Sequence, residues 1–193
     1  MADVHVRPAR PDDAAEIARI QLAIWRTAYT SVVPTRVVEG VADEFAVARW
    51  HAAITAPPSR QHRVLVAQEQ QWTVGFAAFG PADTDDLAGD VDLDPQTTVS
   101  IGALLVEPRW GRRGHGSRLL AAAVDLAREA GHTVGLTWAL EADEASRSFY
   151  RSAGWEPDGT GRAMDMDGST VHEIRLHASL LPADDADDAA DPS

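Results

Sequence analysis

The sequence contains no cysteine, and this absence removes several kinds of chemistry at once. Disulfides, thiolate nucleophiles and cysteine-based metal sites are all excluded, so we expect no metal and a cytoplasmic location. No apolar run approaches the roughly 20 residues that a membrane-spanning helix requires. The first residues, Met1 to Val6, show no signal-peptide pattern either. The sequence therefore predicts a protein without a membrane partner.

Basic residues are missing from the two segments in which aspartates gather. Six aspartates lie between positions 83 and 94 and five between 184 and 191, and neither segment contains arginine or lysine. Taking these eleven charges away from the formal net charge of -13 leaves -2 for the rest of the chain. A nucleic-acid partner is not expected, because neutralising phosphates requires a broad basic face. The acidic segments either attract a cationic acceptor or serve solubility.

The length of 193 residues, with 45% hydrophobic residues, predicts one domain with a full core over residues 1–180. Residues 181–193 form an acidic tail that is rich in alanine and aspartate, and we expect this tail to be disordered. The oligomeric state is not fixed by the sequence, and a homodimer stays open.

Periodicity predicts a mixed α/β fold of about seven strands and about four helices. Strands are expected near 4–7, 63–67, 72–79, 97–106, 133–140, 155–166 and 170–176. Helices are expected from Pro11 towards Pro34, then over 35–56, from the end of the glycine loop at Ser117 to Ala130, and over 143–153. Residues 81–96 are expected to form a long polar loop that is either disordered or flexible over a site. Asp167-Gly168 is expected to form a hairpin turn.

The organising stretch is an apolar strand followed by a glycine-rich loop and a helix. The loop reads Gly111-Arg112-Arg113-Gly114-His115-Gly116-Ser117. Glycines at a helix start leave the main chain open, and the unpaired N–H groups of the first turn then point at an anion. Arg112 and Arg113 add positive charge. The stretch predicts a cradle for a pyrophosphate, in which His115 contributes its backbone amide rather than its ring.

Two other phosphate-binding patterns do not fit this loop. A P-loop needs lysine and then serine or threonine directly after the second glycine, but Ser117-Arg118 follow Gly116. A dinucleotide fingerprint needs a third glycine where Leu119 stands. The loop resembles that of the GCN5-related N-acetyltransferase (GNAT) family, although Gly111 replaces the usual leading glutamine or arginine.

A second motif strengthens the resemblance. The segment runs from Leu140 through Asp143 and Phe149-Tyr150 to Gly154-Trp155, one strand after the glycine loop, which is the order the family shows. The resemblance covers residues 4 to 177 and implies the GNAT element order. It also implies binding of acetyl-CoA as co-substrate. The residues implied to hold that cofactor are Leu104, Leu105 and Val106 on the strand, Arg112 to Ser117 in the loop, and Asp143 in place of the usual asparagine.

The resemblance further implies direct transfer of an acetyl group to a primary amine in a ternary complex. A strand amide near Leu105 would stabilise the oxyanion, and Tyr150 would protonate the departing sulfur. The family often places a glutamate base on the central strand, where this chain has Ser100. The proton would instead travel through water to Glu141, His172 or Glu173, or the acceptor would arrive neutral.

The acceptor site is implied to be walled by Trp25, Tyr29 and Trp138, whose rings suit a cation on an alkyl stem. The acceptor itself is a small amine, an amino-terminal residue or a lysine. Two other functions stay open at this point. One is a catalytically silent acyl-CoA-binding or sensing module, an alternative that Ser100, Gly111 and Asp143 favour. The other is a nucleotide-binding protein that uses the same loop.

Overall fold

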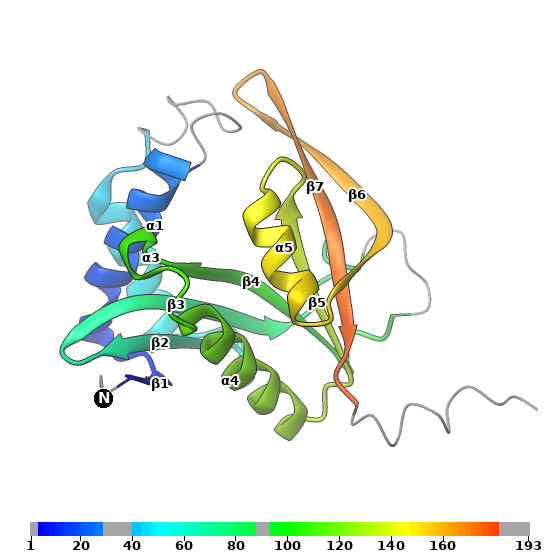
Figure 1. The fold of residues 1–193 in the computed structure, drawn as a ribbon, viewed down its shortest axis with the longest axis horizontal. Coiled ribbons are helices and arrows are strands. Elements are labelled where there is room, and N and C mark those ends of the chain that lie inside the picture. Colours follow the sequence, from blue (N-terminus) through cyan, green and yellow to red (C-terminus); the bar gives the residue numbers. More distant parts are fainter. Residues whose placement is uncertain (1–3, 29–39, 88–92, 182–193) are drawn as a thin grey trace, which may run out of the picture.

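The computed structural model describes residues 4–28, 40–87 and 93–181, which form a seven-stranded mixed sheet flanked by four helices (Figure 1). The strands are β1 (Val4–Pro8), β2 (Arg63–Glu69), β3 (Trp72–Pro81), β4 (Thr98–Val106), β5 (Val134–Leu140), β6 (Glu156–Met166) and β7 (Ser169–Ser179). The helices are α1 (Ala14–Ala28), α3 (Asp43–Thr55), α4 (His115–Glu129) and α5 (Glu144–Ser152), with 3-10 turns η1 (Pro11–Asp13) and η2 (Pro108–Trp110). The predicted fold class is confirmed.

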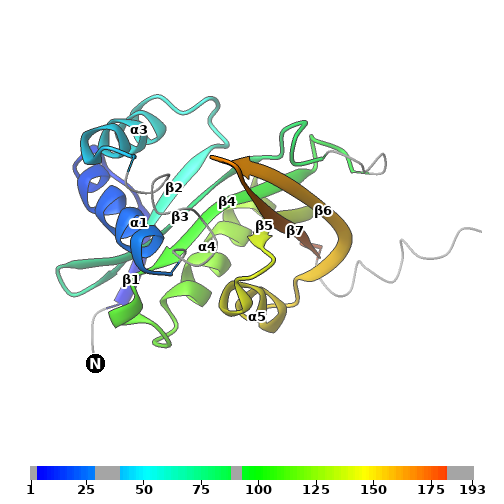
Figure 2. The same cartoon turned by 90° about the horizontal axis from the view of Figure 1, so that it is seen from above.

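The helices cover both faces of the sheet (Figure 2). On one face, Ile17 and Ile20 of α1 pack against Phe76 and other side chains of β2 and β3. On the opposite face, Leu119 and Ala123 of α4 pack against alternate residues of the same strands. Successive side chains of a strand point to opposite faces, so continuous apolar runs in β2 and β3 serve both cores.

The sheet order is β1-β2-β3-β4-β5-β7-β6, and its only parallel neighbours among the described strands are β4 and β5. These two strands pair over three positions, the last of which is Ser100 with Leu136. Beyond this point they separate, and β4 continues to Val106 with a partner on its β3 side alone. Strands β4 and β5 therefore diverge and leave a wedge between them.

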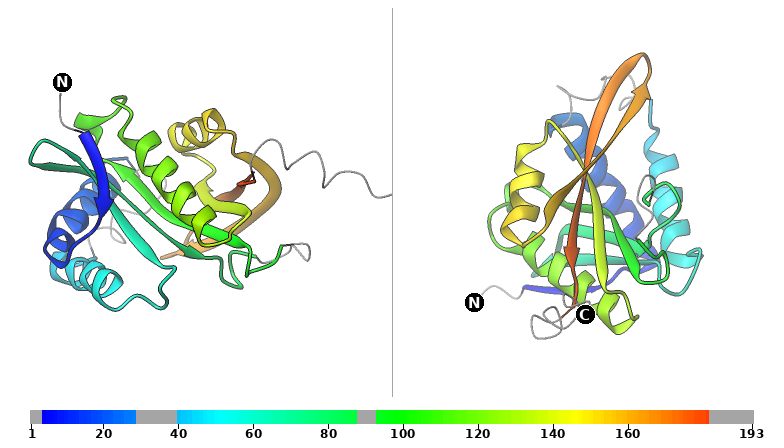
Figure 3. Two further views of the ribbon diagram at one scale, coloured as in Figure 1. Left: turned by 90° about the horizontal axis from the view of Figure 1, so that it is seen from below. Right: turned by 90° about the vertical axis from the view of Figure 1, so that its right-hand side faces the viewer.

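Tight turns and helix ends follow the local chemistry of the sequence. Asp143 caps α5 by accepting a hydrogen bond from the Ser146 amide at 3.1 Å. Asp167 and Gly168 both have positive φ, as a two-residue hairpin turn between β6 and β7 requires. This hairpin extends past the neighbouring strands (Figure 3).

Several predicted boundaries were wrong, among them the start of α4, which begins at His115 inside the glycine loop. The segment Pro11–Asp13 is a 3-10 turn, held by a 2.6 Å hydrogen bond from the Arg10 amide to Asp13, and α1 begins only at Ala14. Helix α3 begins at Asp43, because Gly40 disfavours helix and the acidic pair Asp43 and Glu44 suits a first turn. The loop predicted from Pro81 starts one residue later. The rest of the predicted helix start, residues 35–39, lies outside the described residues, as does the tail from Pro182 onward.

Candidate active site

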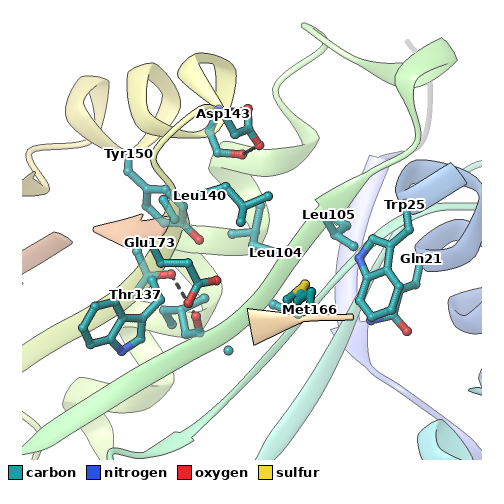
Figure 4. Close-up of a pocket in the computed structure, with 16 residues that line it drawn as sticks. Gln21, Trp25, Leu104, Leu105, Thr137, Leu140, Asp143, Tyr150, Met166 and Glu173 are labelled. Atoms are coloured by element: carbon teal, nitrogen blue, oxygen red, sulfur yellow. Dashed lines mark hydrogen bonds between the residues drawn. The ribbon is translucent and has the colours of Figure 1, made fainter. Parts of the chain in front are cut away.

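A cavity of about 330 Å³ opens where β4 and β5 separate (Figure 4). Its walls come from β4, β5, α1, α5 and the hairpin strands, and most of the exposed lining is apolar. The cavity brings together six of the predicted site residues, namely Trp25, Leu104, Leu105, Trp138, Asp143 and Tyr150. Tyr29 lies outside the described residues.

One wall of the cavity is the free side of β4. After Ser100, no described strand pairs with β4 on the side that faces β5. Gly102 stands at an irregularity in the β3–β4 register. Thr137 marks the fork, because its buried hydroxyl donates a 2.9 Å hydrogen bond to the Ile101 carbonyl. The backbone from Leu104 to Val106 is therefore open to an amide-bearing chain that lies beside it as an added strand would.

The glycine loop presents a run of free backbone donors. Gly111 donates to Pro108 at 3.0 Å, and Arg118 donates to Gly114 at 3.1 Å. Between them, the N–H groups of residues 112–117 donate to no residue in the described part of the chain. Gly114 has φ +80°, a conformation that residues with a side chain rarely adopt, and it is exposed. The loop thus offers six consecutive amides at a helix start.

The ring of His115 faces inward, away from this donor run. Its Nε2 atom lies 2.9 Å from a carboxylate oxygen of Glu69, and its side chain has no exposed surface. Arg113 reaches the same carboxylate at 3.0 Å and lies over the Trp110 ring. Arg113, which we expected at the cofactor, is therefore engaged with Glu69 in this conformation. The loop is fixed to the end of β2 by these two contacts.

A second carboxylate ties the start of the loop to α1. Glu107 accepts hydrogen bonds from Arg19 at 3.1 and 3.2 Å and pairs with Arg109 at 2.9 Å. Burial alone would raise the pKa of Glu107, but the hydrogen bonds from both guanidinium groups hold it below its usual value. Two anchors, Glu69 and Glu107, thus hold the loop against the domain.

Gly116 has a packing role that the sequence did not indicate. A Cβ atom there would lie 3.2 Å from the Phe149 ring and 3.8 Å from Leu104. Gly116 therefore allows α4 and α5 to approach closely. Arg118, which we had not singled out, bends back over the loop, with its guanidinium 3.1 Å from the Arg113 carbonyl. The exposed side chains of Arg112 and Ser117 leave them accessible.

Tyr150 reaches the cavity from α5 and is almost completely buried. Its ring packs against Phe149 and Trp155, with centroids at 5.1 and 5.5 Å. Burial raises the pKa of Tyr150 to about 12, although a hydrogen bond with Thr137 opposes this shift. The phenol is therefore protonated at neutral pH and has a proton to give.

Trp25 of α1 and Trp138 of β5 both line the cavity. Trp25 shares its helix with Gln21, which also lines the cavity and accepts a 2.9 Å hydrogen bond from Trp50 of α3. Trp138 donates to Asp86 at 3.1 Å and carries the Arg162 guanidinium 4.2 Å above its ring. The fully buried Arg175 bonds the Asp86 carbonyl at 3.1 Å. The acidic loop near Asp86 is thus anchored at this wall.

The structure separates the candidates for the proton acceptor. Glu173 lines the cavity, whereas Glu141 and His172 are exposed and do not line it. Ser100 is buried in the paired part of β4 and faces a different hollow. The cavity contains two carboxylates, Asp143 and Glu173, and Asp143 accepts from both the amide and the hydroxyl of Ser146.

Residues 4–28, 40–87 and 93–181 contain no group of three or more acidic or histidine side chains arranged to hold a metal ion. Within those ranges, every helix falls short of the length and apolar character that crossing a membrane demands.

Comparison with known proteins decides the family. The model of the acetyltransferase (GNAT) family matches residues 23–155. The chain belongs to this family. Among curated proteins, it is 28% identical over 151 residues to the uncharacterized N-acetyltransferase YuaI of Bacillus subtilis, which covers 77% of this chain and 78% of YuaI.

Solved structures show the same fold. The structure of the acetyltransferase yncA of Salmonella typhimurium, determined with acetyl-CoA, matches this chain with a TM-score of 0.68 and 22% sequence identity. The match covers 99% of this chain and 98% of the yncA chain. The paia N-acetyltransferase of Thermoplasma acidophilum, in complex with coenzyme A, matches with a TM-score of 0.69 and 14% sequence identity. This match covers 92% of the present chain and 99% of the paia chain. The family and fold predicted from the two motifs are confirmed.

Several residues of the site were not found from the sequence. Gln21, Thr137 and Met166 line the cavity, and Glu69 holds the glycine loop. Thr137 and Met166 sit in strands as ordinary alternating residues, so their types gave no signal. Glu69 lies 46 positions from His115 along the chain, and only the sheet brings the two together.

Proposed function

We propose that this GNAT protein is an acetyl-CoA-dependent N-acetyltransferase that transfers the acetyl group to a primary amine by direct attack in a ternary complex. The observation that carries the proposal is the continuity of the site. Six free amides at the start of α4 adjoin the unpaired side of β4, which leads into the cavity that Tyr150 lines. Acetyl-CoA has a diphosphate, an amide-rich arm and a thioester in the same order.

The proposed pose follows from matching these groups. The diphosphate accepts hydrogen bonds from the amides of residues 112–117, near the positive end of the α4 dipole. The pantetheine amides pair with β4 from Leu104 to Val106, and Asp143 lies at the other side of the cleft. The groups fit because the N–H donors have no competing acceptor in the described residues. In this pose Arg113 would keep its contact with Glu69 and support the loop.

The proposed chemistry is nucleophilic attack by a neutral amine on the thioester carbonyl. A β4 amide near Leu105 would stabilise the tetrahedral oxyanion. Tyr150 would protonate the departing sulfur, and its buried, protonated phenol suits that role. Holding both reactants in one cavity lowers the entropic barrier, for well-oriented groups by about 7–11 kcal/mol.

A catalytically silent acyl-CoA-binding module is the second candidate. The absence of a glutamate on β4 within the cavity favours it, since Ile101 to Leu105 contribute no titratable side chain. The buried phenol of Tyr150 at the fork favours the enzyme. A nucleotide-binding protein has less support, because the strand-like wall of β4 suits the pantetheine arm, which nucleotides lack.

Calorimetry and an acceptor screen test the proposal together. Titration with coenzyme A should show a single binding site, and ATP at the same concentration should bind far more weakly. Amines would then be screened with acetyl-CoA by thiol release, including small amines, peptides with free amino termini and lysine side chains. Binding without turnover on any acceptor would point to the silent module. No binding would remove the proposed function.

A further inference from the structure

We propose that Glu173 of β7 is the residue that receives the proton of the attacking amine, in place of a base on β4. This assignment rests on the proposed function, since it names a catalytic residue for the same acetyl transfer. The β4 wall of the cavity has no side chain that can act as a base. Residues Ile101 to Leu105 of β4 line the cavity with aliphatic side chains and glycine, so β4 supplies no carboxylate or imidazole there.

The position of Glu173 follows from the strand register. Strand β7 runs antiparallel to β5, with Glu173 opposite Leu140 and Arg175 opposite Trp138. Paired residues of neighbouring strands share one face, so Glu173 lies on the same face as the Trp138 ring. Figure 4 shows the Glu173 side chain directed into the cavity. Tyr150 enters the same cavity from α5. The proposed acid and base thus come from different elements.

The Glu173 carboxylate is held in place by one oxygen, and its other oxygen can accept a further hydrogen bond. One oxygen, Oε2, accepts a 2.6 Å hydrogen bond from Nε of Arg162 on β6, and Oε1 accepts no hydrogen bond from the described residues. In Asp143, the other carboxylate of the cavity, both oxygens accept hydrogen bonds from Ser146. Glu173 is therefore the cavity carboxylate with an oxygen available to an ammonium group.

Charged and titratable groups from several elements surround Glu173. Arg162 contributes a positive charge from β6, and Arg175 contributes another from the same face of β7. Arg175 is balanced by Asp158 at 2.6 Å, and the Arg162 guanidinium stacks on Trp138 at 4.2 Å. Tyr150 and Asp143 are the remaining titratable groups of the cavity. The contact with Arg162 fixes the Glu173 carboxylate in a position from which Oε1 can accept a hydrogen bond from an ammonium group.

The proton balance then closes. An acceptor that arrives as an ammonium ion gives one proton to Glu173, and the freed lone pair forms the N–C bond with the thioester carbon. Collapse of the tetrahedral intermediate breaks the C–S bond, and Tyr150 gives its proton to the thiolate. The second proton of the nitrogen restores the Tyr150 phenol, and Glu173 releases its proton to solvent. The products are the amide, coenzyme A thiol and one proton.

This arrangement selects an acceptor class. Glu173 favours amines that are cationic in solution. Trp25 and Trp138 line the same cavity, and because the Arg162 guanidinium already lies over the Trp138 ring, Trp25 offers the aromatic face for the acceptor. Aromatic faces stabilise a cation and bury an alkyl stem. The acceptor is therefore an aliphatic primary amine rather than an aromatic amine.

The test compares Glu173→Gln with the matched variant Glu156→Gln, which alters an exposed carboxylate on β6. The variant Glu173→Gln should lower kcat/KM for an aliphatic amine about 100-fold at pH 7, while calorimetry shows unchanged affinity for coenzyme A. The deficit should shrink as the pH approaches the pKa of the amine, because solvent then supplies the neutral form. It should also shrink for an amine of low pKa, which is neutral at pH 7. Glu156→Gln should behave as the wild type.

Three outcomes would overturn the assignment. Equal activity of Glu173→Gln and the wild type would remove the role, and a deficit that is independent of both pH and amine pKa would make Glu173 a structural residue. A loss confined to Glu141→Gln would move the role to that exposed carboxylate. If the wild-type protein binds coenzyme A but acetylates no amine, the proposed function fails instead, and the variant comparison does not arise.

Discussion

His115 and Glu69 form a buried pair, 2.9 Å apart, directly behind the run of free amides in the glycine loop. Because the partner is a carboxylate, Nε2 of His115 carries the hydrogen of this bond, and Nδ1 has no partner among the described residues. The pair leaves the outer side of the loop to its amides. Its importance can be measured by removing the carboxylate.

The variant Glu69→Ala should destabilise the fold and weaken cofactor binding. It leaves the buried His115 ring unpartnered and frees Arg113, and an unsatisfied buried polar group costs about 1–3 kcal/mol. Urea unfolding would measure this loss, and calorimetry should show weaker binding of coenzyme A. Glu129→Ala, at the exposed end of α4, is the control and should change neither quantity. Wild-type behaviour of Glu69→Ala would show that the anchor is dispensable.

The variant Gly114→Glu should abolish binding of coenzyme A. It places a carboxylate against the amides meant for the diphosphate, and the nearest obstacle to its Cβ is only the flexible end of Arg118 at 2.9 Å. Gly131→Glu is a matched control, since Gly131 also has positive φ but lies in open space at the other end of α4. Both variants carry the same backbone strain, so calorimetry isolates the charge. Unchanged affinity in Gly114→Glu would remove the cradle.

The variant Tyr150→Phe should lower kcat about 100-fold while leaving the affinity for coenzyme A intact. The ring contacts with Phe149 and Trp155 remain, so the fold is kept and only the proton donor is lost. Phe149→Leu tests the packing alone and should reduce activity much less. An unaltered rate for Tyr150→Phe on a working acceptor would reject the general-acid role.

Alkaline pH should destabilise the wild type more than Tyr150→Phe. Burial raises the pKa of Tyr150 from 10.0 to about 12, so the folded state holds this proton more tightly than the unfolded state. The stabilisation is fully present below pH 10 and is lost between about pH 10 and 12, by up to about 1.4 kcal/mol per pH unit. Unfolding free energies measured from pH 9 to 11 should diverge in this direction. Parallel curves would show that the phenol is not buried as described.

The sequence determined the elements of this fold and the identity of its family. Glycines, an N-terminal aspartate cap and apolar periodicities are local features, and each acts within a few residues of its position. They fixed the hairpin turn at Asp167-Gly168, the cap at Asp143 and the glycine loop before α4. The start of α3 was misplaced because the apolar spacing continues across Gly40. The start of α1 was misplaced because proline followed by two acidic residues suits a 3-10 turn as well as the first turn of an α-helix.

The tertiary structure decided which side chains meet. The pairing of β5 with β7 placed Glu173 in the cavity and left Glu141 and His172 outside it. The sequence alone did not distinguish these three candidate proton acceptors. The contact between Glu69 and His115 likewise depends on how β2 lies beside α4. Such contacts join residues far apart in the chain, so their geometry follows from the packing of the whole sheet rather than from any local pattern.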